Sequence, residues 1–525
     1  MDRWSALNSA LASGRISRRE FMTAAAALGV SASVATAAGS AAAAETPKQG
    51  GHLTVGLNGA GAGDSLDPAT YTATFMQVAG LQIYDGLAET DEHNKVRPML
   101  AESWEAKPGA KEWVFKLRRD VVFNNGKPLT AKDVVYTFNQ QRQPSSKSPA
   151  KALLTSVVDV KATDTHEVTF TLSSGNADMP YVVADYHIGI GPEGTNFKDA
   201  VGTGPYTLVN FQPGVRMQTK RNPHYWRTDR GFVDTIETLA INDDTARMSA
   251  LLSGSADLIN RVDPKSVALL KRSPRVQIFE IAGAAHYTFP MRCDVAPFTD
   301  NNVRMGMKWA TDRETMVRNV LLGHGRVGND QPIPSFDQFY AADIPQRTFD
   351  PDKAKFYFKK ASFTGPVTLS VSDGAFNGAV DAAEILAAGA AKAGITVNVN
   401  RTPADGYWDN VWMKAAWCAS YWDGRPTADQ MFSIVYKSDA PWNESFWKDP
   451  AFDKLLLAAR SELDEAKRRQ MYHDMQAMVT DNSGEIIPMF NHTIDAGSSR
   501  VRGFVQRPIL QLGGYRAPSM VWLSS

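Results

Sequence analysis

Two stretches of the sequence alternate between helical and strand-like patterns, and they constrain the fold more than any other feature. Residues 245–253 have the apolar spacing of a helix and residues 256–259 that of a strand. The same strand–helix–strand order recurs around residues 366–400. A helix that crosses over between two strands is typical of layered α/β structures. We therefore expect an α/β fold, and a length of 525 residues indicates two or three lobes.

Local signals support discrete elements elsewhere along the chain. Residues 51–57 and 113–117 alternate as strands do, and residues 157–172 predict two strands around a turn. Thr130 is followed three residues later by Asp133, which is a variant of the helix capping box. A helix is therefore expected to begin just after Thr130.

The charge balance argues against nucleic-acid or membrane-surface binding. The chain has 56 basic and 56 acidic residues, so it lacks the basic excess that such partners require. Its only cysteines, Cys293 and Cys418, are too few for a disulfide scaffold or a four-cysteine metal site. One disulfide and two free thiols both remain open.

The N-terminus has the features of an export signal. Paired arginines at 18–19 precede Phe21 and an alanine-rich apolar stretch over 23–43. This pattern resembles the twin-arginine signal, and an ordinary secretory signal is the alternative. We predict a signal peptide over residues 1–44, cleaved before Glu45, and no lipid anchor because no cysteine follows. The mature protein is expected to be soluble in the periplasm.

Local signatures of catalysis are missing from the sequence. The nine histidines are isolated from one another, and no Cys-x-x-Cys, Gly-x-Ser-x-Gly or phosphate-binding loop motif occurs. We therefore expect no enzyme activity, no metal and no cofactor, and keep an exported cofactor enzyme only as a remote alternative.

Aromatic residues are concentrated between residues 408 and 447, which hold six of the twelve tryptophans. Trp408 and Trp412 have the spacing of one helix face, which predicts a core role. Residues 417–426 begin like a buried strand and end in a charged Gly/Pro turn. Ligands of open α/β sheets bind at such strand ends, in pockets with aromatic walls and few charged anchors. A core edge in which Asp423 and Arg425 simply pair with each other is the alternative.

The segment 113–138 closely resembles the signature of the extracellular solute-binding proteins of peptide-type ABC importers. This is family 5, whose members include dipeptide- and oligopeptide-binding proteins. The motifs at 202–226, 303–314 and 349–354 are similar to those of the same family and occur in the family order.

The resemblance implies a two-lobed periplasmic binding protein of the Venus-flytrap type, with a small extra domain inserted in the first lobe. Such a receptor, expected here as a monomer, binds its solute in the interlobe cleft. It delivers the solute to an inner-membrane permease driven by separate ATPase subunits. The expected boundaries are 45–84, 192–285 and 490–525 for the first lobe, 85–191 for the insertion and 286–489 for the second lobe. The hinge would lie at the crossings near 285 and 489.

The resemblance also implies which residues bind the solute. Peptide-binding members carry an Asp that pairs with the peptide amino group, but Ser420 occupies that place here. Asp423 is then the best amine partner, and Arg292 or Arg425 would meet an anionic group. The aromatic wall would comprise Tyr287, Trp417, Tyr421 and Trp422.

The leading hypothesis is therefore a receptor for a small peptide or peptide-like solute. The alternative keeps the receptor role for a non-peptide solute such as an opine-like conjugate, an amino sugar or a metal chelate.

Overall fold

The computed structural model describes residues 46–524. The predicted signal peptide over 1–44 lies outside the described residues. Within them, no helix has the length and apolar character needed to cross a membrane.

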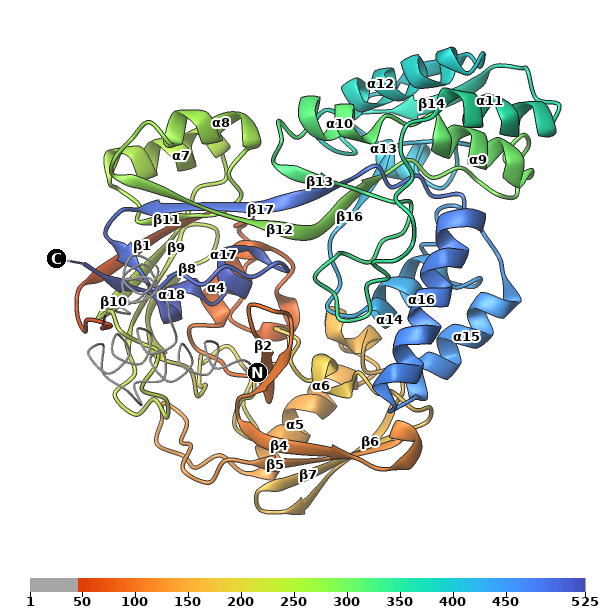
Figure 1. Ribbon diagram of the computed structural model, residues 1–525. Helices are drawn as coiled ribbons and strands as arrows, with labels where there is room; N and C mark the ends of the chain where they lie inside the picture. The colour runs from red at the N-terminus through yellow and green to blue at the C-terminus, as the bar shows by residue number, and fades with distance from the viewer. Residues whose placement is uncertain (1–45, 525) are drawn as a thin grey trace, which may run out of the picture. The chain divides into compact units, whose positions relative to one another are not determined.

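The largest sheet of the described region has nine strands and is traversed by two long antiparallel strands, β12 (Val276–Thr288) and β17 (Met489–Ser498) (Figure 1). They pair from Val276 opposite Ser498 to Tyr287 opposite Met489, with an irregularity between Ala282 and His286. The remaining strands are β1 (His52–Leu57), β8 (Tyr206–Gln212), β9 (Arg216–Arg221), β10 (Thr235–Ala240), β11 (Leu258–Ile259), β13 (Gly325–Val327) and β16 (Ser420–Trp422). The order is β16-β12-β17-β11-β1-β10-β9-β8, with β13 paired to β17.

Both predicted crossover units are confirmed. β10 and β11 lie parallel to β1 on its two sides, joined by α7 (Asp244–Ser253). The Asp243 side chain caps α7 by accepting from the Ala246 amide. β14 (Val367–Val371) and β15 (Val397–Arg401) are likewise parallel and joined by α12 (Ala379–Lys392).

A four-stranded antiparallel sheet has a hydrophobic core of its own, drawn from residues 87–190. In this core the rings of Phe115 and Phe138 meet Phe170 edge-on, at 5.3 and 4.8 Å between centroids. The strands, in spatial order, are β4 (Ala101–Ala106), β5 (Glu112–Leu117), β7 (Glu167–Leu172) and β6 (Val157–Asp164). The helix α5 (Ala131–Arg142) begins with the predicted capping box of Thr130 and Asp133.

The chain between 289 and 489 packs around two further cores, one of which contains Trp417. Besides α12, its helices are α9 (Asn301–Trp309), α10 (Arg313–Asn319), α11 (Pro351–Lys360), α13 (Tyr407–Asn410), α14 (Ala428–Met431), the π-helix η4 (Phe432–Tyr436), α15 (Pro450–Ser461) and α16 (Glu465–Asn482). Trp408 and Trp412 do not share a helix face, because α13 ends at Asn410; Trp408 is exposed, whereas Trp412 packs against one of these cores as predicted.

Short elements complete the described chain. They are η1 (Pro68–Thr70), α4 (Thr74–Gly80), β2 (Ala88–Thr90), β3 (Val96–Pro98), η2 (Pro108–Ala110), η3 (Pro149–Ala152), α6 (Met179–Val182), α8 (Pro264–Leu270), β18 (Val501–Arg502), α17 (Gln511–Gly514), α18 (Ala517–Met520) and β19 (Trp522–Leu523).

Candidate functional site

Two tyrosines lie side by side where β12 and β16 pair. Tyr287 is directly opposite Tyr421 in the antiparallel register, so both rings lie on one face of the sheet. Tyr287 stacks on Phe376 at 3.9 Å between centroids, which fixes its ring. The ring of Tyr421 meets Trp408 edge-on at 5.6 Å and remains 43% exposed. This part of the sheet therefore presents an ordered aromatic surface to solvent.

The loop after β16 places a free carboxylate beside this surface. The side chain of Asp423 is exposed and makes no hydrogen bond or ion pair to any residue between 46 and 524. Arg425 instead donates from Nη1 to the carbonyl oxygens of Asp423 and Gly424, at 3.0 and 3.4 Å. The alternative, in which the side chains of Asp423 and Arg425 pair with each other, is therefore wrong. Arg425 folds the turn and leaves the carboxylate available.

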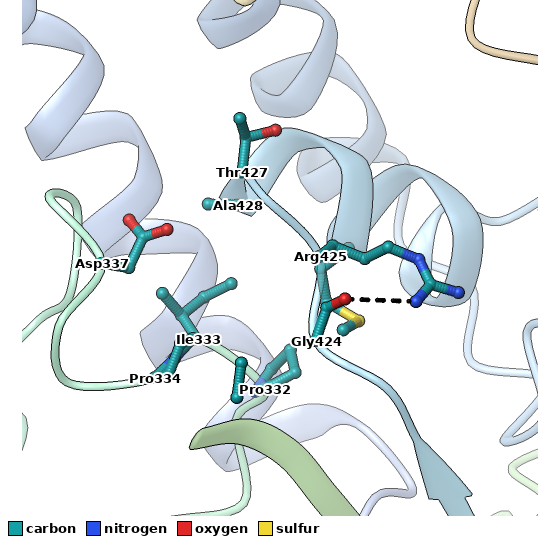
Figure 2. A pocket seen from close by; sticks show the side chains of 10 residues that line it. Pro332, Ile333, Pro334, Asp337, Gly424, Arg425, Thr427 and Ala428 are labelled. Carbon is teal, nitrogen blue, oxygen red and sulfur yellow. Dashed lines mark hydrogen bonds between the residues drawn. The ribbon is translucent and has the colours of Figure 1, made fainter. Parts of the chain in front are cut away.

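A narrow hollow lies behind the same loop. Figure 2 shows Pro332, Ile333 and Pro334 facing Gly424 and neighbouring residues, while the guanidinium of Arg425 points away. The hollow is too narrow for a water molecule, so it offers no room for a solute. The solvent-facing side of the loop is the surface that a solute can reach.

Two further tyrosines approach Asp423 from segments that are distant from it in the sequence. The rings of Tyr186 and Tyr515 meet edge-on at 5.4 Å. Burial raises the pKa of both phenols, and for both the carboxylate of Asp423 raises the pKa further. Tyr186 follows α6 and Tyr515 follows α17, whereas Asp423 follows β16. The fold thus brings three distant segments together.

Arg261 supplies a positive charge on the same side. It follows β11 with a left-handed φ of 52°, and its side chain is exposed without a hydrogen bond or ion pair to the described residues. Burial raises the pKa of Tyr421 and Tyr287, while the charge of Arg261 lowers the pKa of both.

Asp495 of β17 holds the two turns that carry Arg261 and lead to Tyr515. One carboxylate oxygen accepts from the Arg261 amide at 3.2 Å and the other from the Leu512 amide at 2.6 Å. Burial raises the pKa of Asp495 to about 7. The same carboxyl group thus ties down the turn of Arg261 and the turn that leads to Tyr515.

Trp422 faces away from the exposed surface. Its side chain is 6% exposed, and its indole donates to the buried carboxylate of Glu444 at 2.8 Å. Thr288 donates to the same carboxylate oxygen at 3.0 Å. Burial raises the pKa of Glu444. Trp422 therefore supports the loop from behind, and Arg425 lies 6.0 Å from its ring centroid.

Arg292 and Trp417 both have polar contacts within the protein. Arg292 forms a two-point ion pair with Asp294, at 3.0 and 2.9 Å, and also donates to the Met413 and Lys414 carbonyls. Trp417 is fully buried, and its indole donates to the Phe289 carbonyl. The polar groups of both side chains are thus already engaged by other residues of the protein.

Sequence reasoning missed Arg261, Tyr186 and Tyr515. No local motif marks them, because each becomes relevant only through folding contacts with a distant segment. Cys293 and Cys418 are free thiols. No group of three or more His, Cys, Asp or Glu residues able to hold a metal occurs within 46–524.

The fold identifies the structural class of the protein. The mixed α/β architecture is that of two-lobed periplasmic binding proteins. It matches the structure of HbpA2 from Haemophilus parasuis with a TM-score of 0.80 at 24% identity, over 90% of this chain and 100% of the other.

The chain belongs to the bacterial extracellular solute-binding proteins, family 5, whose model matches residues 95–444. It is 27% identical to the probable D,D-dipeptide-binding periplasmic protein DdpA of Escherichia coli K12, over 85% of this chain and 90% of that protein. It is 25% identical to the periplasmic oligopeptide-binding protein OppA of Salmonella typhimurium LT2, over 81% and 84%.

Proposed function

We propose that the protein is the solute-binding component of an ABC importer and binds a small peptide or peptide-like zwitterion. The observation that carries this is a pair of opposite charges near one aromatic surface. Asp423 and Arg261 both extend side chains that have no ion-pair partner among residues 46–524. An unpaired charge that neighbours aromatic rings is what recognition of a charged small molecule requires.

The two charges have distinct roles. Asp423 binds the ammonium group of the solute through charge-assisted hydrogen bonds. Arg261 binds the carboxylate, in place of Arg292, because its planar fork suits two-point binding of an anion. Arg425 holds the loop through the carbonyls of Asp423 and Gly424.

The four tyrosines form the wall of this site. Tyr287 and Tyr421 contribute from the sheet, and Tyr186 and Tyr515 from the opposite segments. Aromatic side chains provide large contact area with few rotatable bonds, so little entropy is lost on binding. The names of the D,D-dipeptide-binding and oligopeptide-binding relatives support a peptide-like solute.

The lobes are assigned as the sequence predicts, with the insertion over 85–191 and the second lobe over 286–489. The separate core of residues 87–190 and the cores within 289–489 support this division. β12 and β17 join the lobes near 285 and 489, and the irregularity between Ala282 and His286 is the flexible part of the hinge. The solute leaves unchanged, so the protein is a receptor and not an enzyme.

The protein acts in the periplasm as a monomer. Residues 1–44 direct its twin-arginine export and are removed without leaving a lipid anchor. An inner-membrane permease with ATPase subunits receives the solute from the closed receptor.

Thermal denaturation with a panel of solutes tests the proposal. A solute that binds only the folded state raises Tm. At a solute concentration a hundred times its Kd, it adds about 2.7 kcal/mol to the free energy of unfolding. We expect a di- or tripeptide with free termini to raise Tm, and its N-acetylated and C-amidated forms to raise Tm less. A response restricted to an opine-like conjugate, an amino sugar or a nickel–histidine chelate would contradict the peptide assignment and favour the non-peptide alternative.

A further inference from the structure

The turn between β2 and β3 contacts the loop that carries Asp423. The side-chain amide of Asn94 donates from Nδ2 to the carbonyl oxygen of Pro426 at 2.7 Å. Asn94 is 7% exposed, and its own carbonyl accepts from the Tyr181 hydroxyl at 3.0 Å. These residues belong to bodies with separate hydrophobic cores, one within 87–190 and the other within 289–489.

The turn itself is held rigidly. One oxygen of Asp91 accepts from the amides of His93 and Lys95, both at 2.9 Å, and the other accepts from Arg97 at 2.6 Å. Asn94 has a left-handed φ of 55°, which Asn tolerates better than most residues. The amide of Asn94 is therefore presented in one direction before it meets Pro426.

A second group of contacts joins the same two bodies. The Ala177 amide donates to the Arg460 carbonyl at 2.7 Å. The guanidinium of Arg468 pairs with Asp178 at 2.9 Å, and both side chains are nearly buried. Asp178 and Arg468 line a crevice of about 740 Å³, so water can reach this region when the contacts separate.

We infer that Asn94 is a positioning residue that holds the Asp423–Pro426 loop in its solute-binding arrangement. The Asp178–Arg468 pair is the second part of this latch between the lobes. The inference rests on the proposed receptor function, because rotation about β12 and β17 would separate both contacts. Both contacts are polar and join bodies with separate hydrophobic cores, so the latch can open without exposing an apolar core.

Hydrogen exchange and small-angle scattering of the solute-free protein test the latch. Asn94→Gly removes the amide and keeps a residue that accepts the left-handed φ. His93→Ala is the matched control, because His93 lies in the same turn and, among residues 46–524, its side chain pairs with Glu92 alone. We expect Asn94→Gly to speed exchange of the amides of 421–425 several-fold and to increase the radius of gyration, with no change in His93→Ala. Asp178→Asn should shift both readings in the same direction.

Amides of β5 and β7 serve as an internal reference. If they also exchange faster in Asn94→Gly, the effect is unfolding and the inference is overturned. Equal exchange and scattering in Asn94→Gly and His93→Ala would overturn it as well. Because no solute is added, failure of the latch is distinguished from failure of the proposed solute class.

Discussion

Tyr287 and Tyr421 lie directly opposite each other on β12 and β16, so their rings share one face of the sheet. Their phenols respond to charges from two different segments, Asp423 of the following loop and Arg261 after β11. The strand pairing thus fixes an aromatic surface near a carboxylate and a guanidinium that have no ion-pair partner among residues 46–524. This relationship is the basis of the proposed recognition of a zwitterion.

Replacing the free carboxylate should weaken solute binding without affecting the fold. Asp423→Asn removes one charge-assisted hydrogen bond of about 1.5–3 kcal/mol, or roughly ten- to a hundred-fold in Kd. Titration calorimetry with the peptide that raises Tm measures this loss. Tm of the solute-free variant should be unchanged, because Asp423 is exposed. Asp405→Asn, another exposed carboxylate, is the control; equal affinities in the two variants would remove Asp423 from the site.

Arg261 should distinguish a free carboxylate from its amide. The wild-type protein should prefer a peptide with a free C-terminus over the amidated peptide, and Arg261→Gln should lose most of that preference. Arg261→Lys keeps the charge and should retain part of it. The measurement is the ratio of the two Kd values for each protein. A ratio that stays the same in Arg261→Gln would assign the anion partner elsewhere.

Arg292 should matter for stability and not for binding. Arg292→Ala loses the ion pair with Asp294 and the hydrogen bonds to the Met413 and Lys414 carbonyls. A loss of roughly 1–2 kcal/mol is expected for these partly exposed contacts. Chemical denaturation measures it, and calorimetry should find an unchanged Kd. Weaker binding with unchanged stability would restore Arg292 as a solute contact.

The buried lysine Lys308 should make stability depend on pH. Burial lowers the pKa of Lys308 to about 7, while its ammonium donates to the Thr480 carbonyl at 2.9 Å. The unfolded state therefore binds more protons between about pH 7 and 10, and stability falls as the pH falls through this range. Lys308→Met removes this pH-dependent loss of stability, which amounts to about 1.4 kcal/mol for each unit by which the pKa of Lys308 is lowered.

Denaturation of both proteins at pH 7 and pH 10 checks this expectation. The stability of Lys308→Met relative to wild type should be higher at pH 7 than at pH 10. Lys355→Met, at an exposed lysine, should show no such difference. A pH-independent difference for Lys308→Met would mean that Lys308 stays charged in the folded protein.

Local patterns predicted the crossover units and the start of α5, because capping and apolar spacing act within a few residues. Asp423 was predicted from its place after a strand rich in aromatic residues and from the family resemblance, and its role in binding stays a prediction. The sequence could not show that Arg292 is already engaged, because its partners Asp294, Met413 and Lys414 meet it only in the folded loop. Arg261 and Tyr515 could not be found, because Asp495 on β17 brings their turns together only in the tertiary structure.

The most direct test of the receptor assignment is native mass spectrometry of protein purified gently from periplasm, before and after denaturation. The account predicts a one-to-one complex that releases a small peptide or peptide-like zwitterion. Asp423→Asn prepared in the same way should retain much less of it. Release of a solute without an ammonium group, equally retained by wild type and Asp423→Asn, would contradict the central claim.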